Sequence, residues 1–101
     1  MKKILLCCAA GMSTSLLVQK IRKAAEAENY ECEIEAVPFK INEPKIEEAD
    51  VVLLGPQVRF NLKPLQERYP DIPAEAIDMR AYGMCDGPTI LKQAKKLLGD
   101  E

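Results

Sequence analysis

The fold is decided by residues 4–28, which read ILLCCAAGMSTSLLVQKIRKAAEAE. Residues 4–7 are a continuous apolar run, the pattern of a strand that is buried on both faces. The apolar residues that follow recur at helical spacing on one face: Leu17, Ile21, Ala24 and Ala25. A hydroxyl residue, Ser13 or Thr14, stands where this helix would begin. The segment therefore predicts a buried strand, a short loop and an amphipathic helix that ends near Glu28.

The rest of the chain alternates between the same two patterns. Further strands are predicted at residues 32–37, 50–54 and 75–78. Further helices are predicted at residues 42–49, 58–69 and from 88 to a stop at Gly99, and Pro64 should kink or split the second of these. Strands that alternate with helices favour a parallel sheet with right-handed crossovers. We therefore expect a single α/β domain over residues 1–101, a three-layer sandwich whose four parallel strands have the order 2-1-3-4.

Composition excludes several classes of function. The 101 residues carry 14 Lys and Arg against 16 Asp and Glu, a net charge of -2, and the charges are interspersed. A nucleic-acid-binding face built on clustered cations is therefore not expected. Histidine is absent, which excludes Ser-His and Cys-His nucleophile pairs and histidine metal sites. We expect no metal and no cofactor.

The cysteines and the short apolar runs indicate the compartment. The four cysteines, which form no C-x-x-C pair, are Cys7, Cys8, Cys32 and Cys85. The apolar run at the start of the chain is far shorter than the roughly 18 residues of a membrane span. We therefore expect a cytoplasmic protein that is not itself embedded in a membrane.

The loop after the first strand has residues suited to binding an anion. In a 2-1-3-4 sheet this loop faces the turn Gly55-Pro56-Gln57, which follows the third strand. Small residues before a helix N-terminus present backbone N–H groups to an anion. The predicted phosphate-binding residues are Ala9, Ala10, Gly11, Met12, Ser13, Thr14 and Ser15.

Cys8 stands at the mouth of this loop. Amide dipoles there would favour the thiolate, so Cys8 is the predicted catalytic nucleophile that accepts a phosphoryl group. The alternative is that Cys8 is a small buried hydrophobic residue at the end of a strand. Cys7 is assigned to the core, because neighbouring residues in a strand point to opposite faces.

Residues 5–18 resemble the active-site segment of the enzyme IIB components of the bacterial sugar phosphotransferase system, lactose/cellobiose (chitobiose) type. Further matching segments are Ala49 to Gln57, Ala76-Ile77-Asp78, Tyr82-Gly83 and Asp86-Gly87. The resemblance implies a phosphocarrier whose Cys8 takes a phosphoryl group from a histidine of a IIA protein. It further implies that the group passes to a sugar, such as cellobiose, chitobiose, lactose or another β-glycoside, held by the membrane-embedded IIC component.

Two alternatives remain beside the phosphocarrier. The loop is also similar to the Cys-x5-Arg cradle of low-molecular-weight tyrosine phosphatases, whose general fold, flavodoxin-like or phosphatase-like, is the one expected here. A phosphatase-like or arsenate-reductase-like enzyme would use the same Cys8. Thr14 stands where that cradle has arginine, and without the guanidinium rapid hydrolysis is disfavoured. The second alternative is a non-enzymatic module that binds an anion.

Three more residues are expected at the periphery of the site. Gln57 would donate to the phosphate or to a partner, or else cap a helix. Asp78 is a candidate general acid or the end of a strand, and Tyr82 would lie on a docking surface around the site. Asp86, a second candidate acid, has a simpler role as the cap of the last helix.

Overall fold

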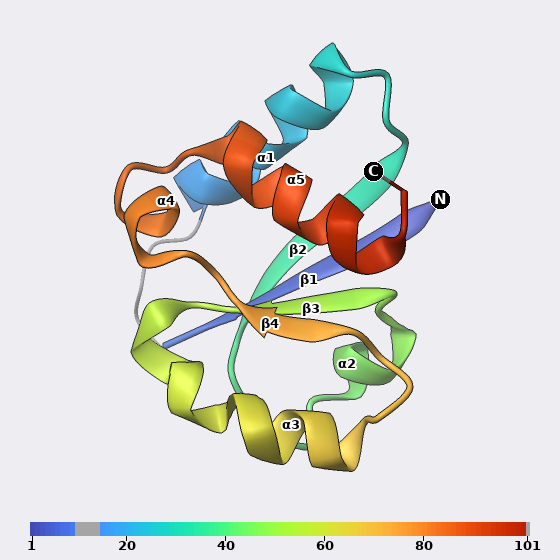
Figure 1. The fold of residues 1–101 in the computed structure, drawn as a ribbon, viewed down its shortest axis with the longest axis vertical. Helices are drawn as coiled ribbons and strands as arrows, with labels where there is room; N and C mark the ends of the chain where they lie inside the picture. Colours follow the sequence, from blue (N-terminus) through green and yellow to red (C-terminus); the bar gives the residue numbers. More distant parts are fainter. Residues whose placement is uncertain (10–14, 101) are drawn as a thin grey trace.

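The protein is a parallel four-stranded sheet with helices on both faces (Figure 1). The computed structural model describes residues 1–9 and 15–100. The strands are β1 (Lys2–Cys8), β2 (Cys32–Pro38), β3 (Val51–Leu54) and β4 (Ala74–Ala76). Their order in the sheet is β2-β1-β3-β4, and each neighbouring pair is parallel. The predicted architecture and strand order are confirmed.

The helices form the two outer layers. On one face lie α1 (Ser15–Ala27) and α5 (Gly87–Leu98), and on the other lie α2 (Pro44–Glu48) and α3 (Leu62–Arg68), as Figure 1 shows. A further short helix, α4 (Met79–Gly83), was not predicted. Residues 75–78 were expected to form a strand, but the strand ends at Ala76, and Asp78 caps α4 through its side chain instead. Gly99, with a φ of 77°, ends α5 as predicted.

The segment after β3 is split, as predicted, but the break lies before Pro64. A 3-10 helix, η1 (Pro56–Asn61), precedes α3, and inside it Val58 has non-helical dihedral angles (φ -120°, ψ 15°). Pro64 stands in the first turn of α3. Backbone N–H groups in a first turn have no partner within the helix, so proline removes nothing there.

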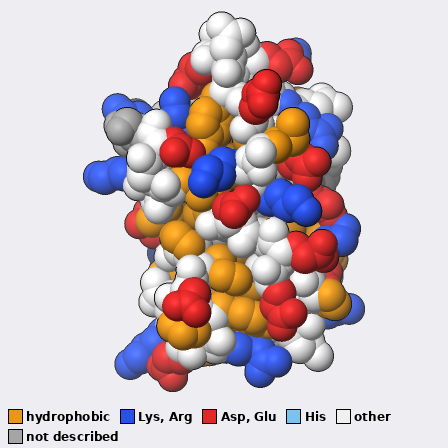
Figure 2. Space-filling model, turned by 90° about the vertical axis from the view of Figure 1, so that its right-hand side faces the viewer, with side chains coloured by type: hydrophobic (Ala, Val, Ile, Leu, Met, Phe, Trp, Pro, Cys, Tyr) orange, Lys and Arg blue, Asp and Glu red, His pale blue; other side chains and the backbone are white. Residues whose placement is uncertain are grey.

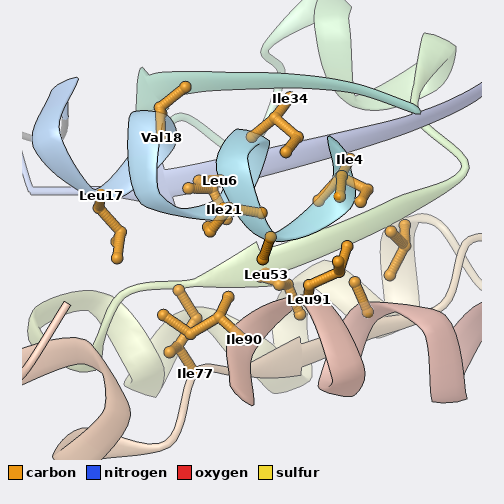
Figure 3. Close-up of a cluster of buried hydrophobic side chains, with 14 of the residues drawn as sticks. Ile4, Leu6, Leu17, Val18, Ile21, Ile34, Leu53, Ile77, Ile90 and Leu91 are labelled. Atoms are coloured by element: carbon orange, nitrogen blue, oxygen red, sulfur yellow. The ribbon is translucent and has the colours of Figure 1, made fainter. Parts of the chain in front are cut away.

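Both faces of the sheet are buried. The central strands β1 and β3 send alternate side chains to the two faces. One cluster packs under α1 and α5, and Figure 3 labels its members Ile4, Leu6, Leu17, Val18, Ile21, Ile34, Leu53, Ile77, Ile90 and Leu91. The other packs under α2 and α3 and contains Leu5, Cys7, Ile46, Val52, Leu54, Val58, Leu65 and Ala74. The assignment of Cys7 to the core is therefore confirmed.

Helices α1 and α5 approach each other closely at Gly87. A Cβ atom on Gly87 would lie 2.3 Å from the carbonyl oxygen of Lys20 and 2.9 Å from the backbone nitrogen of Ile21. Both neighbours are backbone atoms, which no change of rotamer can move away. This helix pair therefore needs a glycine at the first residue of α5, a requirement that the sequence pattern did not reveal.

Side chains donate hydrogen bonds to backbone carbonyls of the two outer strands. In β2, the carbonyl of Ile34 accepts a hydrogen bond from the guanidinium of Arg22, at 3.0 Å. In β4, the carbonyl of Ala74 accepts from the amide of Gln66 at 3.2 Å, and that of Ala76 accepts from Gln93 at 2.8 Å. Polar side chains on α1, α3 and α5 thus satisfy part of the hydrogen bonding at both edges of the sheet.

The face of the molecule near the chain termini carries acidic and basic side chains side by side, with hydrophobic side chains between them (Figure 2). This mixture agrees with the interspersed charge of the sequence. No helix in the described ranges is long and apolar enough to cross a membrane.

Candidate functional site

Cys8 lies at the carboxyl edge of the sheet, as the last residue of β1. It pairs with Pro38 of β2, and its carbonyl accepts a hydrogen bond from the N–H of Phe39 at 2.9 Å. The sequence placed Cys8 in the loop, whereas the structure keeps it in the strand. Regular strand pairing therefore fixes the backbone that carries the sulfur.

Three side chains from separate elements meet around Gly55, directly after β3. A Cβ atom on Gly55 would lie 3.2 Å from Sγ of Cys8, 3.0 Å from Oε1 of Gln57 and 3.5 Å from Cε2 of Tyr82. The φ of Gly55 is -63°, which any residue adopts, so glycine is needed here for space alone. The predicted juxtaposition of Cys8 with the Gly55-Pro56-Gln57 turn is present, and Tyr82 lies beside it.

These groups influence one another's ionisation. The Tyr82 side chain and the backbone of Gly55 both lower the pKa of the Cys8 thiol, and the Gln57 side chain lowers that of Tyr82, each opposing the effect of burial. The N–H of Gly55 donates to the carbonyl of Cys7 at 2.8 Å. Burial raises the pKa of Tyr82 to about 12, so its hydroxyl is protonated at neutral pH and able to donate a hydrogen bond. Cys8 is 2% exposed, yet it belongs to neither hydrophobic cluster.

The electrostatic setting of Cys8 differs from the prediction in one respect. We expected surroundings that favour the thiolate. Burial instead raises the pKa of the Cys8 thiol, and the hydrogen bonds from Tyr82 and Gly55 act in the opposite direction. Residues 10–14, whose backbone N–H groups were expected to supply the positive potential, lie outside the described residues.

Cys7 has a different environment from its neighbour. It is fully buried in the cluster under α2 and α3. Burial, followed by the proximity of Cys8 and Glu43, raises the pKa of Cys7 to about 12. Cys7 is therefore a protonated core residue at neutral pH, whereas Cys8 has polar partners.

Asp78 acts through α4. Its carboxylate accepts a hydrogen bond from the N–H of Ala81 at 3.0 Å, and its carbonyl accepts from the N–H of Tyr82 at 2.9 Å. Asp78 thus begins the short helix that carries Tyr82 to the sulfur. Asp86 caps α5 in the same way, with its carboxylate bonded to the N–H and the hydroxyl of Thr89, which confirms the cap expected there.

The predicted phosphate-binding residues are described only in part. Ala9 is half-buried and packs against the cluster under α2 and α3, and Ser15 is the exposed first residue of α1. The predictions for Ala10, Gly11, Met12, Ser13 and Thr14 fall outside the described residues.

Sequence reasoning missed two features of this site. One is the spatial role of Gly55, for which a glycine directly after a fully buried strand was the available signal. The other is α4, which an aspartate followed by good helix formers could have revealed.

Comparisons with known proteins agree with this geometry. The family model described as the lactose/cellobiose-specific IIB subunit of the PTS system matches residues 3–93. The chain is 46% identical, over 97% of each sequence, to the oligo-beta-mannoside-specific EIIB component of Bacillus subtilis strain 168. It is 39% identical, over 96% of each, to the cellobiose-specific EIIB component of Lactococcus lactis subsp. lactis.

Solved structures show the same relationship. The cellobiose-specific phosphotransferase IIB component from Borrelia burgdorferi superposes with a TM-score of 0.79 at 42% identity, covering 98% of this chain and 93% of that one. The lactose-specific IIB domain from Streptococcus pneumoniae gives a TM-score of 0.81 at 18% identity over 94% of this chain and 95% of the other, which shows the common fold. The chain therefore belongs to the lactose/cellobiose-specific IIB family and is a phosphotransferase component of sugar phosphorylation.

Proposed function

We propose that the chain is a phosphoryl carrier in which Cys8 accepts a phosphoryl group from a histidine of a IIA protein and passes it to a sugar held by a membrane-embedded IIC protein. The observation that carries this proposal is the contrast between two adjacent thiols. Cys7 is sealed in a hydrophobic cluster, while the Cys8 sulfur lies at the carboxyl edge of the sheet among hydrogen-bond donors. Ligands of parallel α/β sheets bind at this edge.

The chemistry requires two displacements at phosphorus. Cys8 first loses its proton, and the thiolate attacks the phosphorus of the phosphohistidine. An S–P bond forms, and the N–P bond breaks with its electron pair returning to the imidazole. In the second displacement a sugar hydroxyl gives up its proton and forms an O–P bond. The S–P bond then breaks, and Cys8 is regenerated as a thiolate.

Residues 9–15 are the proposed cradle for the phosphoryl oxygens. Their support is the position of α1, which begins at Ser15, so that its positive end lies shortly after Cys8 in the chain. A cradle of backbone donors with Thr14 in place of arginine favours a persistent phosphocysteine over hydrolysis.

The proposed sugar is a β-linked saccharide. Two of the relatives, those named for oligo-beta-mannoside and for cellobiose, support this class. The proposed protein partners would contact exposed apolar side chains on the elements that border the carboxyl edge: Leu16, Phe60, Met79 and Met84. Both partnerships place the chain in the cytoplasm.

Phosphorylation of the whole protein tests the assignment. After incubation with a phosphorylated IIA protein, we expect intact-mass spectrometry to show one added phosphoryl group in the wild type and in Cys7→Ala. We expect none in Cys8→Ala. Fragment spectra that place the phosphoryl group on any other residue would reject Cys8 as the acceptor.

A second assay separates a carrier from a phosphatase. The wild type is expected to hydrolyse p-nitrophenyl phosphate negligibly, because the cradle lacks an arginine to stabilise the transition state. Rapid turnover that disappears in Cys8→Ala would establish the phosphatase alternative instead.

A further inference from the structure

We propose that Tyr82 is a second catalytic residue, whose hydroxyl donates a hydrogen bond to the Cys8 sulfur and stabilises the negative charge that this sulfur carries whenever it is not phosphorylated. Its part in transfer rests on the proposed function, whereas its effect on the free thiol does not. The sequence had placed Tyr82 only on a docking surface at the periphery.

The geometry around Gly55 supports this role. The Cys8 sulfur and a ring carbon of Tyr82 lie 3.2 Å and 3.5 Å from the position that a Cβ atom of Gly55 would occupy, so the two side chains are neighbours, and the Tyr82 side chain lowers the pKa of the Cys8 thiol. Tyr82 is half-buried, so little water competes for the bond. The phenol therefore lies beside the atom that would form and break the bond to phosphorus.

Two other residues position the Tyr82 hydroxyl. Gln57, at the start of η1, lowers the pKa of Tyr82 and so favours its ionised form, as expected when the amide N–H donates to the phenol oxygen. Asp78 caps the helix that carries Tyr82. In the proposed arrangement Gln57 donates to Tyr82 and Tyr82 donates to the sulfur, so that each bond polarises the next.

The other titratable groups near this pair do not supply the same stabilisation. Cys7 precedes Cys8 in β1, Glu43 acts on Cys7 from the segment before α2, and Cys85 lies close to Tyr82 after α4. Each is a thiol or a carboxyl group, and ionisation of any of them would oppose a thiolate at Cys8. Within the described residues, the groups that lower the pKa of the Cys8 thiol are the Tyr82 side chain and the backbone of Gly55.

The same bond assists both displacements. Before the first displacement it raises the fraction of Cys8 that is ionised and able to attack phosphorus. In the second displacement the electron pair of the S–P bond returns to sulfur, and the hydroxyl is already placed to receive the developing charge. Tyr82 neither gains nor loses a proton in either step.

The pH dependence of Cys8 alkylation tests this role without any partner protein. The probe is iodoacetamide, and fragment spectra identify the alkylated residue. Tyr82→Phe keeps the ring and removes the hydroxyl, so we expect the midpoint of Cys8 alkylation to rise by about one pH unit and the rate at neutral pH to fall about tenfold. A Tyr82→Phe profile that superimposes on that of the wild type would overturn the proposal.

Two further variants control the experiment. Tyr69→Phe removes a hydroxyl that bonds to the carbonyl of Ile41, remote from the sulfur, and its Cys8 profile should equal that of the wild type. Gln57→Met removes the donor to Tyr82 at similar side-chain length, and a smaller upward shift is expected. A Gln57→Met profile equal to the wild type would remove Gln57 from the proposal.

Transfer assays distinguish the two proposals. If Tyr82→Phe shifts the alkylation profile but phosphoryl groups never reach Cys8, the proposed function fails and the contact stands. If Cys8 of the wild type is phosphorylated but Tyr82→Phe leaves the alkylation profile unchanged, only the role of Tyr82 fails. If both stand, phosphorylated Tyr82→Phe should pass its phosphoryl group on about tenfold more slowly than the wild type.

Discussion

Two glycines mark close approaches in this protein, but they do so for different reasons. At Gly87 the space that a Cβ atom would need is filled by the backbone of α1, 2.3 Å away at the carbonyl oxygen of Lys20. At Gly55 the same space is bordered by the ends of three side chains, at 3.0 to 3.5 Å. The first site joins two helices of the core, and the second leaves room around a sulfur.

The difference teaches that stability and reactivity are separable in this chain. Backbone cannot move aside without shifting a whole helix, so an added methyl group at Gly87 must separate α1 from α5. The ends of side chains can shift by a few tenths of an ångström, so the fold tolerates a methyl group at Gly55 while the arrangement of donors around Cys8 does not.

The largest expected effect is that of Gly87→Ala on folding. The added Cβ overlaps backbone atoms of Lys20 and Ile21, and we expect the free energy of unfolding to fall by about 3 kcal/mol or more. Urea denaturation followed by circular dichroism measures it. Gly83→Ala is the matched control, because a Cβ there meets nothing within 4 Å, and its stability should stay within about 0.5 kcal/mol of the wild type. Equal stability of the two variants would contradict the packing argument.

Gly55→Ala should change the reactivity of Cys8 more than the stability of the fold. We expect a loss of stability of about 1 kcal/mol or less, because flexible side chains can adjust. The rate of Cys8 alkylation by iodoacetamide at neutral pH should nevertheless fall about tenfold, since the sulfur is pushed away from its donors. A variant that folds and reacts like the wild type would show that the space at Gly55 is not needed.

The two helix-capping aspartates give a paired test of the same separation. Asp86→Ala and Asp78→Ala each remove one cap and should each lower the free energy of unfolding by about 1 kcal/mol. Only Asp78→Ala should also slow Cys8 alkylation, because only α4 carries Tyr82. If Asp86→Ala slowed the alkylation as much, the effect would be general loosening of the fold.

The smallest expected effect concerns Cys7 at alkaline pH. Its pKa is about 12 in the folded protein against 9.0 for an ordinary thiol, so above pH 9 the unfolded chain loses this proton and the folded chain keeps it. Stability from this group is complete below pH 9 and is lost as the pH rises toward 12. Between pH 8 and 9.5 the free energy of unfolding should fall further in the wild type than in Cys7→Ala. The difference should be less than about 1 kcal/mol. Parallel curves of stability against pH for the two proteins would show that folding does not raise the pKa of Cys7.

The two-sided core could be predicted because it depends on patterns that single segments display, and the strand order because strands and helices alternate along the chain. The uninterrupted apolar residues of β1 and β3 already indicate burial on both faces, and the alternation along β1 already separates Cys7 from Cys8. Asp86 and Gly99 are local signals for the two ends of α5, and both were interpreted correctly.

The features that escaped prediction depend on distance between segments. The need for glycine at residue 87 comes from contact with α1, which lies far away in the sequence. The residue pattern of α5 does not indicate this contact. Asp78 looked like the end of a strand because a run of apolar and acidic residues precedes it, although its side chain caps α4. The meeting of Tyr82 with Cys8 likewise arises only once α4 folds back over the carboxyl edge.

The outer strands have a consequence for how copies of this protein coexist. Arg22, Gln66 and Gln93 already occupy carbonyls along both borders of the sheet. A foreign strand that sought to extend the sheet would first have to displace these side chains. In the proposed function the chain meets one partner after another, and these occupied sheet edges would disfavour lasting attachment through strand pairing.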